Sequence, residues 1–120
     1  MQEENIRAAV YDFNSALNRD ECCASGPHVR ISRNFPNPFS RTTRFIIELG
    51  REMMLSVTVY NSVGRAVRLI EPSRLFRPGK HEIVWNGRDN SGGKVGSGVY
   101  VCEIRAEHRP YYLKVSYLSL

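Results

Sequence analysis

Apolar and polar residues alternate with a period of two over most of the chain from His28 onward. Phe45, Ile47 and Leu49 occupy every second position of one stretch, and residues 55–59 repeat the pattern. Successive side chains of a β-strand point to opposite faces, so this alternation is typical of strands with one buried face. We therefore expect short strands throughout this part of the chain.

Turn-forming residues divide the first strands at short intervals. Residues 61–64 predict a hairpin turn in which Gly64 adopts a positive φ angle, and residues 66–70 predict the return strand. Residues 77–79 (Arg-Pro-Gly) predict a second turn, and the five glycines within residues 86–98 predict a loop.

The last part of the chain repeats this organisation. Residues 99–106 and 111–118 predict a final hairpin around a turn at 107–110. About seven short strands at roughly 8–12-residue spacing are typical of an all-β, immunoglobulin-like β-sandwich. This is the predicted fold class.

The first residues follow a helical pattern instead. Apolar side chains in residues 3–18 recur on one face of a helix, at Ile6, Ala9, Val10, Phe13 and Leu17. A helix of this length is only marginally stable alone in water. We therefore expect it to pack on the sandwich or on a partner. Residues 18–27 are small and polar and end in Gly-Pro, which predicts a linker. The predicted organisation is therefore an arm and linker over residues 1–27, followed by the sandwich over residues 28–120.

Composition supports one folded domain. Hydrophobic residues make up 42% and charged residues 24% of the 120 positions, which are ordinary values for a globular protein. No apolar run approaches the roughly 18 residues that a membrane-spanning helix needs. The start of the chain, Met-Gln-Glu-Glu, is acidic and is not a secretory signal peptide as written.

Charge is unevenly distributed along the sequence. The net charge is +5; residues 1–33 contribute −1 and residues 34–120 contribute +6. Five basic side chains are grouped around one predicted hairpin and the turn that follows it: Arg65, Arg68, Arg74, Arg77 and Lys80. They are either a solvated face or a contact for an acidic protein surface, anionic lipid headgroups or nucleic acid. Nucleic acid is the least favoured of these because most aromatic residues fit core positions and are not left to stack on bases.

Catalytic, metal and cofactor sites are not expected. His28, His81 and His108 are dispersed, and neither a nucleophile elbow nor a Cys/His spacing typical of zinc is present. Cys22, Cys23 and Cys102 are interpreted as free thiols, with Cys102 inside a strand. We therefore predict that the protein is not an enzyme.

Four motifs resemble a known family. Residues 34–39 (Asn-Phe-Pro-Asn-Pro-Phe), 57–67, 81–89 and 97–100 occur in the order found in bacterial Ig-like domains. These domains are similar to that of the flagellar hook-capping protein and to the C-terminal sorting modules of type IX secretion. The chain departs from the family pattern at three positions, which are Asn61, Asn86 and Cys102.

The motif residues are expected to serve the fold. Pro36 and Pro38 fix the backbone, and Phe35 and Phe39 are expected to be buried anchors. Trp85 and Tyr100 are expected in the core, each with a partner for its polar end. Asp89 and Asn90 are expected to bond their own backbone in a turn. The full set of expected structural positions is Phe35, Pro36, Asn37, Pro38, Phe39, Gly64, Trp85, Gly87, Asp89, Gly98 and Tyr100.

The favoured hypothesis is a non-catalytic accessory subunit that docks onto a larger bacterial complex. Its expected contacts are the arm residues Ile6, Val10, Phe13 and Leu17 and the five basic residues named above. The alternatives are a C-terminal sorting module, a hook-cap-like role, and binding of nucleic acid or an anionic surface. The resemblance implies the cell envelope or exterior, whereas the missing signal peptide argues the other way.

Overall fold

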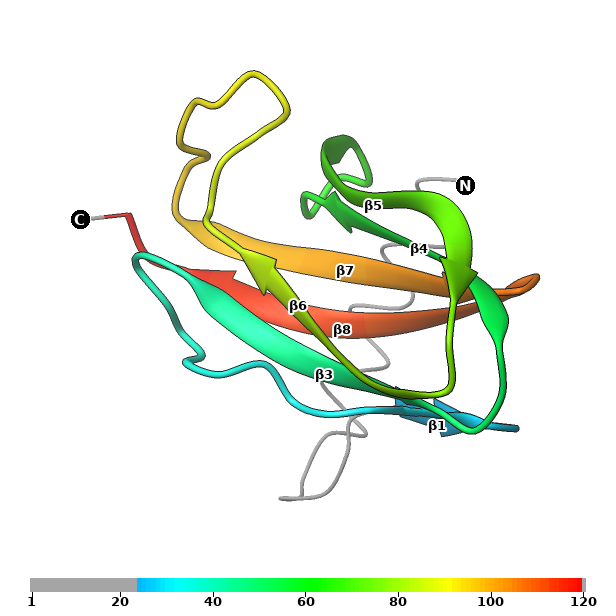
Figure 1. Ribbon diagram of the computed structural model, residues 1–120. Coiled ribbons are helices and arrows are strands. Elements are labelled where there is room, and N and C mark those ends of the chain that lie inside the picture. Colours follow the sequence, from blue (N-terminus) through cyan, green and yellow to red (C-terminus); the bar gives the residue numbers. More distant parts are fainter. Residues whose placement is uncertain (1–23, 120) are drawn as a thin grey trace.

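Eight antiparallel strands form two sheets that pack face to face (Figure 1). The computed structural model describes residues 24–119, so the helix predicted over residues 3–18 lies outside the described residues. The strands are β1 (Ala24–Gly26), β2 (Val29–Ile31), β3 (Thr43–Leu49), β4 (Met53–Tyr60), β5 (Ala66–Phe76), β6 (Gly79–Trp85), β7 (Gly98–Ala106) and β8 (Arg109–Tyr117).

The predicted all-β sandwich is confirmed. One sheet has the strand order β1-β2-β3-β6 and the other the order β5-β4-β7-β8. Inward side chains of both sheets meet in one apolar core, as the period-two pattern requires. Phe45, Ile47 and Leu49 of β3 and Val57 and Val59 of β4 all belong to this buried core.

The return strand is longer than the sequence predicted. We expected residues 66–70, whereas β5 continues to Phe76. Its register with β4 shifts at several points, between Leu55 and Val57 among others. Each shift moves the next side chain out of strict alternation, and Pro72 interrupts the pattern as well. The alternation in the sequence therefore ends before β5 does, and the predicted strand was too short.

The last residues of the predicted linker also differ from expectation. Ala24–Gly26 form β1, which pairs with β2, so the linker prediction for residues 18–27 is wrong over these three positions. A tight turn at Pro27-His28 allows the pairing, and His28 adopts a φ of 63° there. The division of the chain at residue 27 remains a prediction.

The final hairpin turns more tightly than predicted. Residues 109 and 110 belong to β8, where Arg105 pairs with Pro110 and Ala106 with Arg109. Only Glu107 and His108 remain in the turn, and Glu107 has a φ of 58°. Pro110 is accommodated because β8 is an edge strand, where a missing N–H is tolerated.

Candidate interaction surfaces

The motif at residues 34–39 ties the beginning of the sandwich to its end. Phe39 is 2% exposed, and its ring lies 5.4 Å from that of Trp85 and 4.9 Å from that of Tyr117. The Phe39 N–H donates to the Ser116 carbonyl at 3.0 Å, and its carbonyl accepts from the Leu118 N–H at 2.9 Å. Phe39 is therefore the buried anchor that the sequence predicted.

The prediction that Phe35 is also a buried anchor is wrong. Its side chain is 71% exposed, so it is not a buried anchor. The backbone of Phe35 exchanges two hydrogen bonds with Arg44, at 2.8 and 3.1 Å. Arg44 is an outward position of β3, and this bridge fixes the Phe35 backbone while leaving its ring in solvent. The peptide bonds before Pro36 and Pro38 are cis, and the Asn37 Oδ1 accepts from the Ser116 N–H at 2.9 Å.

Trp85 and Tyr100 have the polar partners that the sequence called for. Their rings meet edge to face at 5.3 Å. The Trp85 Nε1–H donates to the Arg88 carbonyl at 3.0 Å, and the Tyr100 hydroxyl donates to the Gly96 carbonyl at 2.5 Å. Burial raises the pKa of the Tyr100 hydroxyl, with a smaller contribution from Tyr117. Both residues hold the loop at 86–97 to the core.

That loop is shaped by two adjacent side chains with different roles. The Asp89 Oδ1 accepts from the N–H groups of Ser91 and Gly93, at 2.9 and 3.0 Å, as predicted. The Asn90 Oδ1 instead accepts from the Leu69 N–H at 2.9 Å, so the predicted local turn contact of Asn90 is wrong. Asn90 reaches an edge strand that lies 21 positions earlier in the sequence, which no local pattern indicates.

The glycines of the motifs occupy positions with positive φ. The φ angles are 91° at Gly64, 71° at Gly87 and 155° at Gly98. A Cβ at Gly87 would also lie 2.7 Å from the Tyr117 ring. Every motif residue other than Phe35 is thus explained by turns, core packing or loop attachment.

Reactive groups are not assembled in residues 24–119. Cys102 is completely buried, and burial raises the pKa of its thiol to about 12. Among the described residues, no group of three His, Cys, Asp or Glu side chains is arranged to hold a metal ion. That part of the chain also contains no helix able to cross a membrane.

The five basic residues near β5 do not form one open cluster. Arg68 donates to the Asp89 carbonyl at 3.1 Å, and Arg74 pairs with Glu71 at 3.1 Å while lying over the Phe76 ring. The other three are exposed: Arg65 precedes β5 at one end, whereas Arg77 and Lys80 lie three positions apart at the other end, where β5 is followed by β6. This arrangement does not support the nucleic-acid hypothesis.

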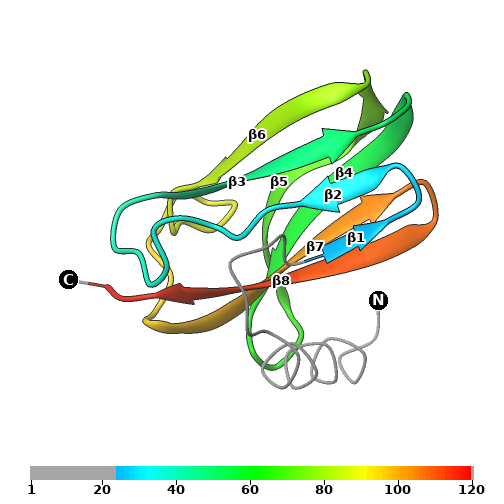
Figure 2. The ribbon, with the colours of Figure 1, turned by 90° about the horizontal axis from the view of Figure 1, so that it is seen from below.

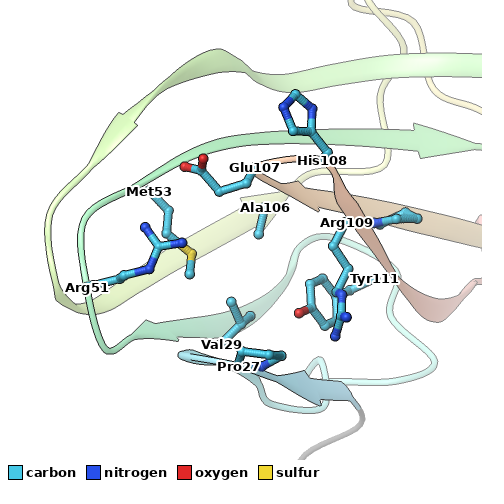
Figure 3. A pocket seen from close by; sticks show the side chains of 10 residues that line it. Pro27, Val29, Arg51, Met53, Ala106, Glu107, His108, Arg109 and Tyr111 are labelled. Carbon is cyan, nitrogen blue, oxygen red and sulfur yellow. The ribbon is translucent and has the colours of Figure 1, made fainter.

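A groove opens between the sheets at one end of the sandwich (Figure 3). Its volume is about 560 Å³, and its apolar lining includes Val29, Met53 and Tyr111. Arg51, in the turn between β3 and β4, and Arg109, the first residue of β8, both line it. Sequence analysis missed this groove because its residues come from three chain reversals and from the strand ends beside them, which are far apart in the sequence.

The outward faces of the two sheets differ in exposure. On β3 and β6 the outward residues Arg44, Glu48, Lys80, Glu82 and Val84 are exposed, and Ile46 is half-buried. The second sheet has what we call the β4–β7–β8 face, defined by the mid-strand outward residues Thr58, Tyr60, Val101, Glu103, Tyr112 and Lys114. Each of these is buried or half-buried. The outward residues Met54 and Val99, near the ends of β4 and β7, are exposed and do not belong to it. Sequence alternation alone predicts two equally open faces.

A buried carboxylate lies on the β4–β7–β8 face. Glu103 is 5% exposed, pairs with Arg105 at 2.9 Å and accepts from the Tyr60 hydroxyl at 3.3 Å. Burial, followed by the Glu103 charge and hydrogen bond, raises the pKa of the Tyr60 hydroxyl. Burial and, to a smaller extent, the Glu103 charge also raise the pKa of the Tyr112 hydroxyl. The face is therefore partly shielded from water.

Residues 43–110, from β3 into β8, match the FlgD Ig-like domain. The chain belongs to this family. The match covers more than half of the sequence and contains three of the four motifs, while the motif at 34–39 precedes it. Among curated proteins, no match to this chain is found.

Solved structures resemble this FlgD Ig-like domain, and the match to PorU shows a shared fold. Dimeric latent PorU from Porphyromonas gingivalis matches with a TM-score of 0.55 and 22% identity, over 72% of this chain and 9% of PorU. PorZ, described as an essential bacterial surface component of the type-IX secretion system of the same organism, matches with a TM-score of 0.45 and 20% identity. That match covers 75% of this chain and 11% of PorZ. The chain thus spans about a tenth of these two proteins.

Proposed function

We propose that this FlgD Ig-like domain is a non-catalytic attachment module that docks onto a larger, envelope-associated bacterial protein complex. Family membership and the use of the motif residues for the fold support this proposal. So does the occurrence of the fold as a small part of the much longer PorU chain. The arm residues Ile6, Val10, Phe13 and Leu17 lie outside the described residues, and their role as a second contact remains a prediction.

The observation that carries the proposal is the end groove with its two arginines. Val29, Met53 and Tyr111 offer an apolar lining, and Arg51 and Arg109 supply positive charge beside it. The only carboxylate of the lining is that of Glu107, which accepts from the Met54 N–H at 2.7 Å. The groove therefore suits an acidic segment of a partner protein that inserts an apolar side chain.

Charge reversal at the groove tests this function. The double variant Arg51→Glu/Arg109→Glu should lose the partner that co-purifies with the wild-type chain from its native host. Arg30→Glu/Arg33→Glu changes the net charge by the same amount at two exposed positions away from the groove and should keep it. A photo-crosslinker at Arg109 should also link to an acidic segment of that partner. Retention of the partner by the groove variant would contradict the proposal.

A C-terminal sorting module is the second candidate, supported by the motif at residues 34–39. The test is a fusion of this chain to the end of a periplasmic reporter in a bacterium with type IX secretion. A sorting module should bring the reporter to the cell surface, where added protease removes it. A reporter that stays protected inside would exclude sorting and leave the docking proposal intact.

A further inference from the structure

The unequal exposure of the two sheets needs a physical cause. Inward residues of β7 are Tyr100, Cys102, Ile104 and Ala106, and all four belong to the core cluster between the sheets. Val101 and Glu103 alternate with them and therefore point outward. Val101 is nevertheless 0% exposed, although it is not part of that core cluster. Something other than the opposite sheet shields this position.

We infer that residues 3–18 form an amphipathic helix that packs its apolar stripe on the β4–β7–β8 face of the same chain. The stripe is Ile6, Ala9, Val10, Phe13 and Leu17, and it needs an apolar surface to be stable in water. Val101 and the rings of Tyr60 and Tyr112 provide such a surface on the more shielded of the two outward faces that residues 24–119 form. This inference concerns contacts within the chain. It is independent of the groove proposal, and it replaces the predicted role of the stripe as a second contact for a partner.

The dimensions of the two surfaces agree. A helix over residues 3–18 is about 24 Å long, and the nine residues of β7 extend over roughly 30 Å. The axes of β4 and β8, one strand to either side of β7, are about 10 Å apart, close to the diameter of a helix with its side chains. One helix therefore covers the face.

The point where the described chain begins also favours this placement. β1 starts at Ala24 and contacts β8, the edge strand that borders the face (Figure 2). Residues 19–23 then span up to about 17 Å between helix and strand. This reach is enough to bring a helix from the β8 edge onto the middle of the sheet.

The net charges of residues 3–18 and of the β4–β7–β8 face together with the adjacent Arg105 have opposite signs. Residues 3–18 contain Glu3, Glu4 and Asp12 against one arginine, Arg7. On the face and beside it, Arg105 and Lys114 outnumber Glu103. The raised pKa values of Tyr60 and Tyr112 agree with a covered surface, because desolvation is the largest cause of each.

Thiol labelling of the full chain tests the inference. In a Cys22→Ser/Cys23→Ser background, Thr58→Cys reports on the β4–β7–β8 face and Ile46→Cys reports on the outward face of the other sheet. Both positions are half-buried in mid-strand. Adding Phe13→Glu should release the stripe from the β4–β7–β8 face. The thiol-labelling rate at position 58 should then rise at least ~10-fold, and the rate at position 46 should not change. Asn14→Glu, outside the stripe, should change neither rate.

Two labelling results overturn the inference. An unchanged rate at position 58 in Phe13→Glu means that the arm does not cover this face. An equal rise at positions 58 and 46 means that the whole sandwich has opened, so the arm is not a separable cover.

A nitroxide on Asn14→Cys, in the same background, provides an independent measurement. It should broaden the amide resonances of Tyr112 and Lys114 and leave those of Arg44 and Glu82 sharp. If broadening of Tyr112 appears only when label and isotope are on different molecules, the cover comes from a second copy. That outcome, like the absence of broadening, overturns the intramolecular contact.

Discussion

The side chain of Asn90 closes part of the free edge of β5, because its Oδ1 accepts a hydrogen bond from the Leu69 N–H at 2.9 Å. The backbone of Asn90 adds a second contact, from its N–H to the Val67 carbonyl at 3.0 Å. The loop at residues 86–97 thus occupies backbone groups that an edge strand otherwise presents to solvent.

Replacing Asn90 tests how much the hydrogen bond between its side chain and Leu69 contributes to stability. Asn90→Ala removes the acceptor for Leu69 and should lower the free energy of unfolding by about 1 kcal/mol. Chemical denaturation measures the change. Ser91→Ala, at the adjacent exposed position, should have an effect below about 0.5 kcal/mol. Equal effects of the two substitutions would show that the Asn90 contact contributes nothing specific.

The two phenylalanines of the motif at 34–39 should differ sharply. Phe39→Ala removes a buried ring that touches Trp85 and Tyr117 and should cost about 3–5 kcal/mol of stability. Phe35→Ala removes an exposed ring and should change stability by less than about 0.5 kcal/mol. Thermal and denaturant unfolding of both variants provide the comparison. A large loss in Phe35→Ala would refute the assignment of Phe39 as the sole anchor of this pair.

Three glycine-to-alanine substitutions should form a graded series. Gly87→Ala combines a φ of 71° with a Cβ only 2.7 Å from the Tyr117 ring, and it should cost at least about 2 kcal/mol. Gly92→Ala has a φ of 93° and no close neighbour, so it should cost about 1 kcal/mol. Gly96→Ala meets neither obstacle and should be neutral or slightly stabilising. Unfolding midpoints should follow this order.

Cys102 should make stability depend on alkaline pH. Burial raises the pKa of its thiol from 9.0 to about 12, so the folded protein keeps a proton that the unfolded chain releases above pH 9. The stabilisation is complete below pH 9 and decreases between pH 9 and 12, by at most about 1.4 kcal/mol per pH unit. Denaturation of wild type and Cys102→Ala at pH 8 and pH 10.5 measures it. The wild type should lose more stability over this interval, and equal losses would contradict the buried thiol as the cause.

Much of the sandwich follows from the sequence because burial imposes a regular pattern on each strand. β3, β4 and β6 have strict alternation, and residues such as Ile47 and Val57 were placed correctly for that reason. The extent of β5 could not be found in this way, because register shifts relative to β4 break the alternation.

Other features depend on tertiary contacts that no local pattern contains. Phe35 and Phe39 occupy similar positions in one motif, yet only Phe39 reaches the core. The end groove combines residues from the ends of several strands and the turns between them, and Arg51 and Arg109 are 58 positions apart in the sequence. Val101 matched a strand pattern, but the alternation places it on the outward face and does not predict that it is 0% exposed.

The hydrogen bonds between residues 37–39 and residues 116–118 also bear on when the domain can finish folding. The Ser116 N–H reaches Asn37 across 79 positions, so almost the whole chain must be available before this contact forms. Contacts of such long separation slow folding because closing the intervening loop costs entropy early in the process. A chain emerging from the ribosome or a translocation channel thus has to release residues 116–118 before the ring of Phe39 can settle between Trp85 and Tyr117.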